Sequence, residues 1–377
     1  MHSNNINDML REGFTEKFAR YYLEQIEAEN NSPLFERDYA DWAHSMGFLA
    51  HNAYICGLTP DNVNEYLSDY DYYRIWPLNN WSRIWINDKL TLKYILAGTE
   101  FDGMMPEYYY YSSGKGLRKL MDSADDEQDI DALVRILKRK KALACKPNNS
   151  SGSQGFVKLS FNGTFFIDGQ ATDEAGIAEF VSEHKNYIFT EYLEPAEHFR
   201  RIYPKIHTLR VITVNEHGND PYIAASYIRF PNSTSGSANY RADCDDVSYN
   251  LFTDVDVNSG TLGGTRKVFA KRTESVNVHP DTGIEISANN LWGGGTKEKI
   301  LGIAKLFSLV EYMGFDIGLT DRGPKIMEIN SHPGIGYLQM FRGFFTDERL
   351  GKYFRAKIDM LEALSEREKL SRNGITR

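Results

Sequence analysis

The chain has little cysteine, with only three residues (Cys56, Cys145 and Cys244) in 377. They are far apart and form neither a CxxC pair nor a zinc-binding spacing. An odd number of scattered cysteines excludes a disulfide framework and is typical of a reducing compartment. We therefore expect a cytoplasmic protein.

Long apolar runs are also missing. No segment approaches the roughly 18 apolar residues needed to cross a bilayer. The first eight residues are polar and lack the basic and apolar regions of a signal peptide. With 41% hydrophobic and 25% charged residues, the composition is that of a soluble globular protein, so we expect no membrane partner.

An excess of positive charge is absent as well. The net charge of −9 argues against a broad nucleic-acid-binding surface, although it leaves room for a local basic pocket. We therefore expect no nucleic-acid partner. A chain of 377 residues can hold two or three domains, or one large fold with an appendage.

Three oxygen-bearing side chains near the C-terminus form the most informative pattern. Residues 317–330 read as two short strands joined by a turn, with Asp316 just ahead of the first strand. Glu328 and Asn330 are two apart and therefore share a strand face, and a turn at 321–324 places Asp316 opposite them. This hard-ligand set suits Mg²⁺. Exposed edge charges are the alternative, but Glu328 and Asn330 interrupt an apolar strand, which favours ligands.

A loop of small residues follows the predicted strand 142–146. It contains Ser151, Gly152 and Ser153, and Lys146 ends the strand before it. The backbone N–H groups of such a loop can approach phosphate oxygens closely, and the lysine supplies a positive charge. The pattern is not a Walker A motif, because no Gly-Lys-Ser/Thr follows. A flexible hairpin loop is the alternative interpretation.

Two further strands carry polar residues at informative places. The predicted strand 187–192 ends in an acidic stretch, where main-chain groups can pair with adenine and nearby acidic or imidazole side chains can hold ribose. Arg210 interrupts the apolar strand 208–214. A buried arginine is rare without an anion, so phosphate or a substrate carboxylate is its natural partner.

Periodicity predicts several other elements. Thr59 and Pro60 are typical of a helix start, and apolar spacing predicts one helix over 296–313 and another over 350–370. His332 follows the predicted metal strand and could be structural or lie beside an acceptor.

Taken in order, these pieces resemble the ATP-grasp superfamily over roughly residues 80–345, and in detail its sugar-transfer-associated members. The matching segments are 87–89, Lys146-Pro147 with its loop, 190–195 with His198, 208–211, 279–283 and 323–331. The family also has an asparagine followed by a Gly-Gly pair within 230–260, which is missing at 239–246 here.

The resemblance implies an α+β ATP-grasp fold, in which two subdomains grip ATP, with a helical N-terminal region. The divisions it implies are a helical region (1–80), a linker segment (81–141), subdomain 1 (142–195), subdomain 2 (196–345) and a C-terminal helix (346–377).

The resemblance also assigns site residues, with ATP and Mg²⁺ as cofactors. Phosphates would be contacted by Lys89, Lys146 and the Ser151–Ser153 loop. Adenine would lie against Glu191, Tyr192 and Leu193, and ribose near Glu194, Glu197 or His198. Asp316, Glu328 and Asn330 would bind Mg²⁺, and Arg210 would stabilise the transferred phosphate; Arg210 and Lys146 would be the catalytic residues.

The implied activity is an ADP-forming ligase that activates a carboxylate as an acyl phosphate and joins it to an amine, in polysaccharide or peptide natural-product modification. Its partners would be small-molecule carboxylates and amines. A phosphotransferase on the same ATP site and a non-catalytic nucleotide-binding protein are the alternatives. The two substrates and the oligomeric state stay open.

Overall fold

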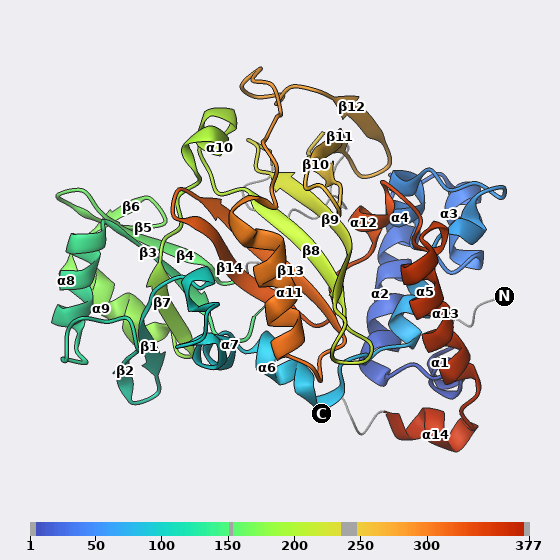
Figure 1. Ribbon diagram of the computed structural model, residues 1–377, viewed down its shortest axis with the longest axis horizontal. Helices are drawn as coiled ribbons and strands as arrows, with labels where there is room; N and C mark the ends of the chain where they lie inside the picture. The colour runs from blue at the N-terminus through green and yellow to red at the C-terminus, as the bar shows by residue number, and fades with distance from the viewer. Residues whose placement is uncertain (1–4, 151–153, 235–246, 373–377) are drawn as a thin grey trace.

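The computed structural model describes residues 5–150, 154–234 and 247–372. Within these ranges the chain forms two seven-stranded sheets in which every paired strand is antiparallel, with a bundle of helices beside the second sheet (Figure 1). None of the helices in the described ranges combines the length and apolar character needed to span a bilayer.

The N-terminal region is helical, as predicted. Its helices are α1 (Ile6–Arg11), α2 (Glu16–Asn31), α3 (Arg37–Ser45), α4 (Ala50–Cys56) and α5 (Asp69–Arg74), with the 3₁₀ turn η1 (Val63–Glu65). The helix start predicted at Thr59 is wrong. The Thr59 N–H donates to the Asn62 side chain at 2.8 Å, and this closes a turn ahead of η1.

Short helices connect this region to the first sheet. They are η2 (Asn80–Arg83), α6 (Ile84–Asn87), α7 (Lys89–Leu96) and η3 (Asp102–Met104). Asp88 caps α7, because its side chain accepts from the Thr91 N–H at 2.7 Å.

The first sheet has the order β2-β1-β7-β3-β4-β5-β6. Its strands are β1 (Tyr108–Ser113), β2 (Gly116–Lys119), β3 (Ala142–Pro147), β4 (Val157–Phe161), β5 (Phe165–Ile167), β6 (Gln170–Thr172) and β7 (Tyr187–Glu191). Helices α8 (Ile130–Lys140) and α9 (Glu174–Glu183) pack on one face, where Leu133 and Leu137 of α8 meet Phe189 of β7. On the other face, Tyr108 and Ile188 belong to a separate hydrophobic core, and Ala144, Lys146 and Thr190 line a cavity.

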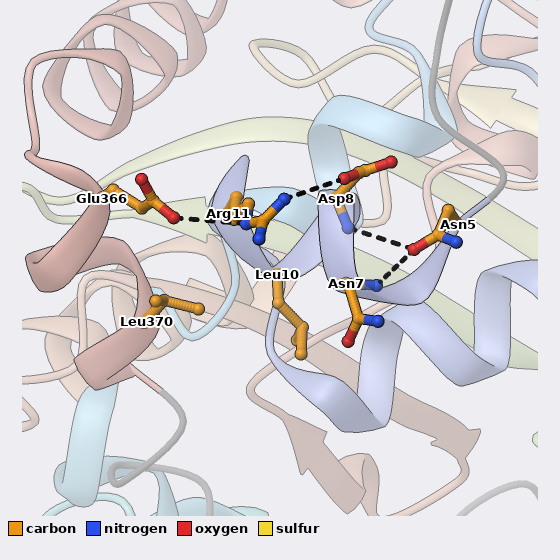
Figure 2. Close-up of a pocket in the computed structure, with 7 residues that line it drawn as sticks. All are labelled: Asn5, Asn7, Asp8, Leu10, Arg11, Glu366 and Leu370. Carbon is orange, nitrogen blue, oxygen red and sulfur yellow. Dashed lines mark hydrogen bonds and ion pairs between the residues drawn. The ribbon is translucent and has the colours of Figure 1, made fainter.

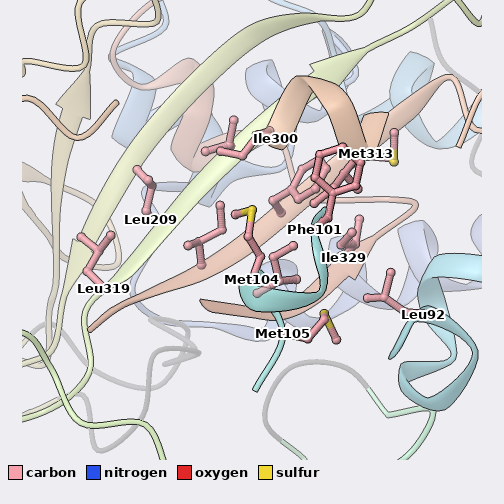
Figure 3. Close-up of a cluster of buried hydrophobic side chains, with 14 of the residues drawn as sticks. Leu92, Phe101, Met104, Met105, Leu209, Ile300, Met313, Leu319 and Ile329 are labelled. Carbon is pink, nitrogen blue, oxygen red and sulfur yellow. The ribbon is translucent and has the colours of Figure 1, made fainter. Parts of the chain in front are cut away.

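The second sheet has the order β12-β11-β10-β9-β8-β13-β14. Its strands are β8 (Thr208–Val214), β9 (Tyr222–Phe230), β10 (Asn250–Val255), β11 (Leu262–Val268), β12 (Thr273–Val276), β13 (Tyr312–Thr320) and β14 (Gly323–Asn330). Helix α11 (Thr296–Leu306) covers one face, and Figure 3 shows Ile300 of this helix in the same cluster as Met313 of β13 and Phe101.

The remaining helices flank the second sheet. They are α10 (Glu197–Ile202), η4 (Gly293–Gly295), α12 (Gly336–Gln339), η5 (Phe344–Thr346), α13 (Glu348–Glu362) and α14 (Glu366–Ser371). The core formed by α5, α12 and α13 with β8 and β13 includes Tyr72, Ile212, Tyr312 and Phe354. These helices therefore cover one part of the face opposite α11. Another part of that face lines the cavity between the two sheets.

Two predicted helices are wrong in extent. The helix predicted over 296–313 ends at Leu306, and Tyr312 and Met313 pair with Val214 and Thr213 of β8. Phe307 and Val310 lie beyond the end of α11 but are buried in the same core as that helix. Their apolar spacing therefore matches a helix although they are not part of one. The helix predicted over 350–370 is two helices, because Ser365 begins α14 with a capping box.

His207 supplies a stability test. It lies wholly buried just before β8, with ring centroids 5.2 Å from Phe199 and 5.0 Å from Phe230. Burial lowers its pKa to about 3, and His279 adds to the shift. Below about pH 6.5 His207 is protonated in the unfolded chain but stays neutral in the folded chain. The free energy of unfolding therefore falls by about 1.4 kcal/mol for each pH unit of acidification.

We therefore expect His207→Phe to flatten the acid side of the stability curve. Between pH 7 and pH 5 the wild type should lose about 2 kcal/mol of unfolding free energy through this group, and the variant should not. Denaturant titrations at the two pH values measure the difference, with the exposed His217→Gln as control. Equal losses in wild type and His207→Phe would contradict the expectation.

Candidate nucleotide and metal site

A cavity of ≈ 490 Å³ opens between the two sheets. Strands β3 and β7 of the first sheet and β8, β9, β13 and β14 of the second contribute to its walls. Its lining combines cations, carboxylates and apolar side chains: Lys89, Pro106, Ala144, Lys146, Ser150, Gln154, Phe156, Asp168, Thr190, Glu191, Tyr192, Leu193, Lys205, Ile206, Thr208, Arg229, Pro231, Asp316, Met327 and Glu328.

The β13–β14 hairpin brings the three predicted metal ligands together. Asp316 pairs directly with Glu328 across the hairpin, and the Asn330 amide donates to the two carboxylates at 3.2 Å and 3.1 Å, respectively. Asp316 lies inside β13 and not ahead of it as predicted, because the strand begins at Tyr312.

A bulge shapes β14 at this point. Asp316 pairs with Glu328, but its neighbour Ile317 pairs with Ile326, so Met327 is one extra residue. The bulge turns Ile326 toward the same buried core as Ile329, while Glu328 lines the cavity. The bulge therefore explains how Glu328 can face the cavity although its neighbours in β14 are mostly apolar.

Arg210 is held by Asp316. The two residues face each other across β8 and β13, with Nε 2.8 Å from Oδ1 and Nη2 donating to Oδ2 at 3.0 Å. Burial raises the pKa of Asp316 to about 7, against the charge of Arg210. The pKa of Glu328 lies below its ordinary value, because Lys89 and Asn330 outweigh its burial.

Two lysines approach the carboxylates from the side of the first sheet. The Lys146 ammonium donates to the Met327 carbonyl at 3.3 Å, and the Lys89 ammonium donates to the Ser150 carbonyl at 2.6 Å. Burial lowers the pKa of Lys146 to about 8, and the neighbouring charge of Lys89 adds to the shift. Both side chains line the cavity beside Glu328.

Removing the Lys146 charge tests its predicted role. We expect Lys146→Met to weaken ATP binding about tenfold or more, because a charge-assisted hydrogen bond to phosphate is about twice as strong as a neutral one. Calorimetric titration with ATP and Mg²⁺ measures the change. The exposed Lys185→Met is the control, and unchanged ATP affinity in Lys146→Met would remove the residue from the site.

The end of β7 forms the wall opposite the carboxylates. Glu191, Tyr192 and Leu193 all line the cavity, and the Lys158 ammonium lies 4.1 Å from the centre of the Tyr192 ring. The Glu107 N–H donates to the Glu191 carboxylate at 3.2 Å.

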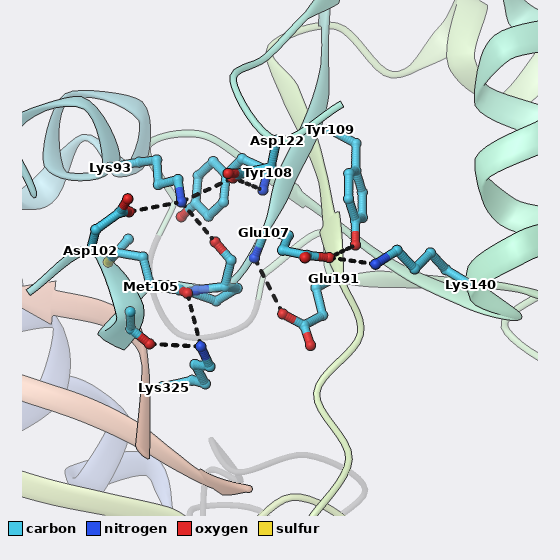
Figure 4. Close-up of polar contacts among 12 residues, drawn as sticks. Lys93, Asp102, Met105, Glu107, Tyr108, Tyr109, Asp122, Lys140, Glu191 and Lys325 are labelled. Atoms are coloured by element: carbon cyan, nitrogen blue, oxygen red, sulfur yellow. Dashed lines mark hydrogen bonds and ion pairs between the residues drawn. The ribbon is translucent and has the colours of Figure 1, made fainter. Parts of the chain in front are cut away.

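A polar network fixes this strand end against its surroundings. Figure 4 shows Glu107 and Glu191 with Lys140, whose ammonium pairs with the Glu107 carboxylate at 2.6 Å. On the other side, Arg322 in the β13–β14 turn pairs with Glu191. The strand end is thereby tied both to the segment just before β1 and to the β13–β14 hairpin.

Some predicted site residues lie elsewhere. Glu194, Glu197 and His198 are exposed and do not line the cavity; Glu197 pairs with Arg201, and the His198 ring contacts the Ser287 carbonyl at 2.6 Å. Their proximity to ribose stays a prediction. Ser151, Gly152 and Ser153 fall outside the described residues, as does the segment 239–246.

His332 lies half-buried in an aromatic cluster, with both of its ring nitrogens buried. Its ring is stacked on Tyr72 at 4.5 Å and lies 4.0 Å from Trp76, centre to centre. Burial lowers its pKa to about 3. This placement favours the structural interpretation of His332 over a role beside the acceptor.

Several cavity residues were missed by the sequence reasoning. Arg229 and Thr208 are buried and face each other across β8 and β9, and Lys205 and Asp168 also line the cavity. Arg229 carried a usable signal, since it interrupts an apolar strand just as Arg210 does.

A second hollow, of ≈ 470 Å³, lies between α1 and α14 (Figure 2). Arg11 crosses it to pair with Glu366 at 3.2 Å. Its lining contains none of the residues of the cavity between the sheets.

Comparison with protein families identifies the fold. The family model described as sugar-transfer associated ATP-grasp matches residues 78–352. The chain belongs to this ATP-grasp family. No curated protein matches the sequence significantly.

Solved ATP-grasp structures resemble the chain only distantly. D-alanyl-alanine synthetase A from Vibrio cholerae is 15% identical, with a TM-score of 0.42 over 77% of this chain and 66% of that one. L-amino acid ligase from Bacillus licheniformis is 9% identical, with a TM-score of 0.37 over 68% and 42%. The ATP-grasp ligase PsnB is 16% identical, with a TM-score of 0.36 over 74% and 61%. At these values the neighbours do not bear on the reaction of this chain.

The cavity fits the cofactors of ATP-grasp enzymes, ATP and Mg²⁺. Among the described residues no group of three or more His, Cys, Asp and Glu side chains could hold a metal. A cation here would therefore take the oxygens of two carboxylates and the Asn330 amide, the hard donors that Mg²⁺ prefers. The two lysines stand where they can neutralise a triphosphate.

Proposed function

We propose that this ATP-grasp protein is an ADP-forming carboxylate–amine ligase that acts in polysaccharide or peptide natural-product modification. The observation that carries the proposal is the convergence, in one cavity, of Asp316 and Glu328 with Lys89 and Lys146, backed by the Arg210–Asp316 pair. It unites a site for Mg²⁺ with cations for the phosphates of ATP.

In the first step a carboxylate oxygen of the acid attacks the γ-phosphorus of ATP. The bond from this phosphorus to the β–γ bridging oxygen breaks, so that ADP leaves and an acyl phosphate forms. Mg²⁺ supplies charge that offsets the phosphate oxygens. Lys146 and Arg210 stabilise the charge that develops, and the two sheets keep out water, which would hydrolyse the acyl phosphate.

In the second step a neutral amine attacks the acyl carbon. The carbon–oxygen bond to phosphate breaks and inorganic phosphate leaves, and the departing phosphate accepts the proton that the nitrogen loses as the amide forms. No covalent enzyme intermediate is needed, because positioning and electrostatic stabilisation suffice for phosphoryl transfer.

The proposal is tested by product analysis. The protein is incubated with ATP, Mg²⁺, hydroxylamine and a panel of acids, and hydroxamate and ADP are measured together. Equal amounts of the two with one acid are expected. A phosphorylated product without hydroxamate would identify a phosphotransferase, and bound ATP that is never turned over would identify a non-catalytic nucleotide-binding protein.

A further inference from the structure

The β13–β14 hairpin that carries the candidate metal ligands is not closed by its own strands at one end. Its last ladder pair is Gly314 with Asn330, and Asn330 is also the last residue of β14. β13 begins two residues before this pair, at Tyr312, where it pairs with β8. Among the described residues, β14 therefore has no strand partner beyond the ligand Asn330.

Asn79 takes the place of a strand at this end. Its side-chain oxygen accepts from the Tyr312 N–H at 3.1 Å, and its side-chain nitrogen donates to the Tyr312 carbonyl at 2.6 Å. The same nitrogen donates to the Ser331 carbonyl at 3.2 Å. Because an amide side chain carries the donor and acceptor of a peptide group, Asn79 joins the start of β13 to the residue that follows Asn330.

Asn87 holds the same serine from another side. Its side-chain oxygen accepts from the Ser331 N–H at 3.1 Å, and its side-chain nitrogen donates to the Ser331 hydroxyl at 3.0 Å. Ser331 is 2% exposed. Its N–H, carbonyl and hydroxyl groups are thus all bound by the side chains of two asparagines, which fixes the peptide that follows Asn330.

The next two residues are held by the end of the helical N-terminal region. The Tyr72 hydroxyl donates to the Pro333 carbonyl at 2.6 Å, and the Trp76 ring lies 4.0 Å from the ring of His332. The segment 331–333 is therefore bound along its whole length by side chains from residues 72–87.

We propose that residues 72–87 position the metal ligand Asn330, with Asn79 as the principal positioning residue. The Asn330 amide nitrogen donates to the Asp316 and Glu328 carboxylates, which leaves its oxygen to bind a cation. Hydrogen bonds that orient a ligand from outside the metal site commonly change metal affinity about tenfold to a hundredfold. This role rests on the assignment of Asn330 to Mg²⁺ in the proposed function.

Manganese binding to the complex of the protein with ADP tests this role without turnover. Mn²⁺ prefers the same oxygen ligands as Mg²⁺, and the electron paramagnetic resonance signal of free Mn²⁺ measures how much is bound. The variants are Asn79→Ala and Asn87→Ala. Asn330→Ala is the reference for loss of the ligand itself.

Asn215→Ala is the matched control. Asn215 is 1% exposed, and its side-chain nitrogen donates to the Ala304 carbonyl at 2.9 Å. It therefore also joins two elements, the end of β8 and helix α11, through a buried amide. Among the described residues, its side chain makes no hydrogen bond to the β13–β14 hairpin.

Asn79→Ala and Asn87→Ala should bind Mn²⁺ about tenfold or more weakly than the wild type. Their affinity for ADP in the presence of a chelator should be unchanged, because neither side chain lines the cavity. Asn215→Ala should unfold at a lower temperature, since a buried hydrogen bond is lost, yet bind Mn²⁺ as the wild type does.

Wild-type Mn²⁺ affinity in Asn79→Ala would overturn the role of this residue, and an equal loss in Asn215→Ala would attribute the effect to general loosening. If Asn79→Ala shows no cooperative unfolding, the exposed Asn87 decides: unchanged affinity in Asn87→Ala would then overturn the role. Wild-type affinity in Asn330→Ala would remove Asn330 from the metal site and this role with it, while the hydroxamate assay would still test the ligase proposal separately.

Discussion

Glu328→Gln is expected to reduce Mg²⁺-dependent use of ATP strongly while the protein stays folded. The substitution keeps the shape of the side chain but removes one of the two carboxylates that face each other across the hairpin. Metal-ion stabilisation is worth several kcal/mol, and about 1.4 kcal/mol corresponds to a factor of ten in rate. The expected loss of ADP release is therefore about a hundredfold to a thousandfold.

Two measurements distinguish this result from general damage. Calorimetry with ATP should show binding that Mg²⁺ strengthens in the wild type and no longer strengthens in Glu328→Gln. Thermal unfolding should give a transition as cooperative as that of the wild type. Glu183→Gln, an exposed carboxylate at the end of α9, is the control. Full activity in Glu328→Gln would refute the metal assignment.

Arg210→Met is expected to reduce both activity and stability strongly. The guanidinium and the Asp316 carboxylate are largely buried, with side-chain exposures of 12% and 9%, and they pair at 2.8 Å. Removing one partner of a buried ion pair leaves a buried charge without compensation, which costs about 3–5 kcal/mol of unfolding free energy. Denaturant titration measures the loss.

A double substitution separates the two effects. Asp316→Asn combined with Arg210→Met removes both charges, so stability should recover in part while activity stays lost. Arg200→Met is the matched control: its 3.6 Å pair with Asp321 is exposed, and exposed pairs contribute about 0–1 kcal/mol. A loss in Arg210→Met no larger than in Arg200→Met would contradict the expected stabilisation by the buried pair.

The sequence predicted much of the local structure that carries the site. Strand 208–214 agrees residue for residue. This strand depends on neighbours in the chain, namely alternating apolar residues. For the same reason the hairpin that brings Asp316 opposite Glu328 could be predicted from a short segment.

Errors arose where a local pattern had two interpretations. The spacing of Phe307 and Val310 continues the helix 296–306, yet these residues leave it and lead into β13. Both placements bury the same apolar side chains, and only pairing with β8 favours the strand. The bulge at Met327 was likewise not predictable from the local sequence, because its one-residue shift exists only relative to the partner strand.

By itself, the sequence determined the ATP-grasp family, the helical N-terminal region and the residue types that suit phosphate and Mg²⁺. The tertiary structure alone decided that Arg229 and Thr208, 21 residues apart in the chain, face each other in the cavity, and that Glu194, Glu197 and His198 lie outside it. The physical reason is that strand register and the packing of one sheet against the other set distances between segments remote in sequence, and local propensity carries no information about them.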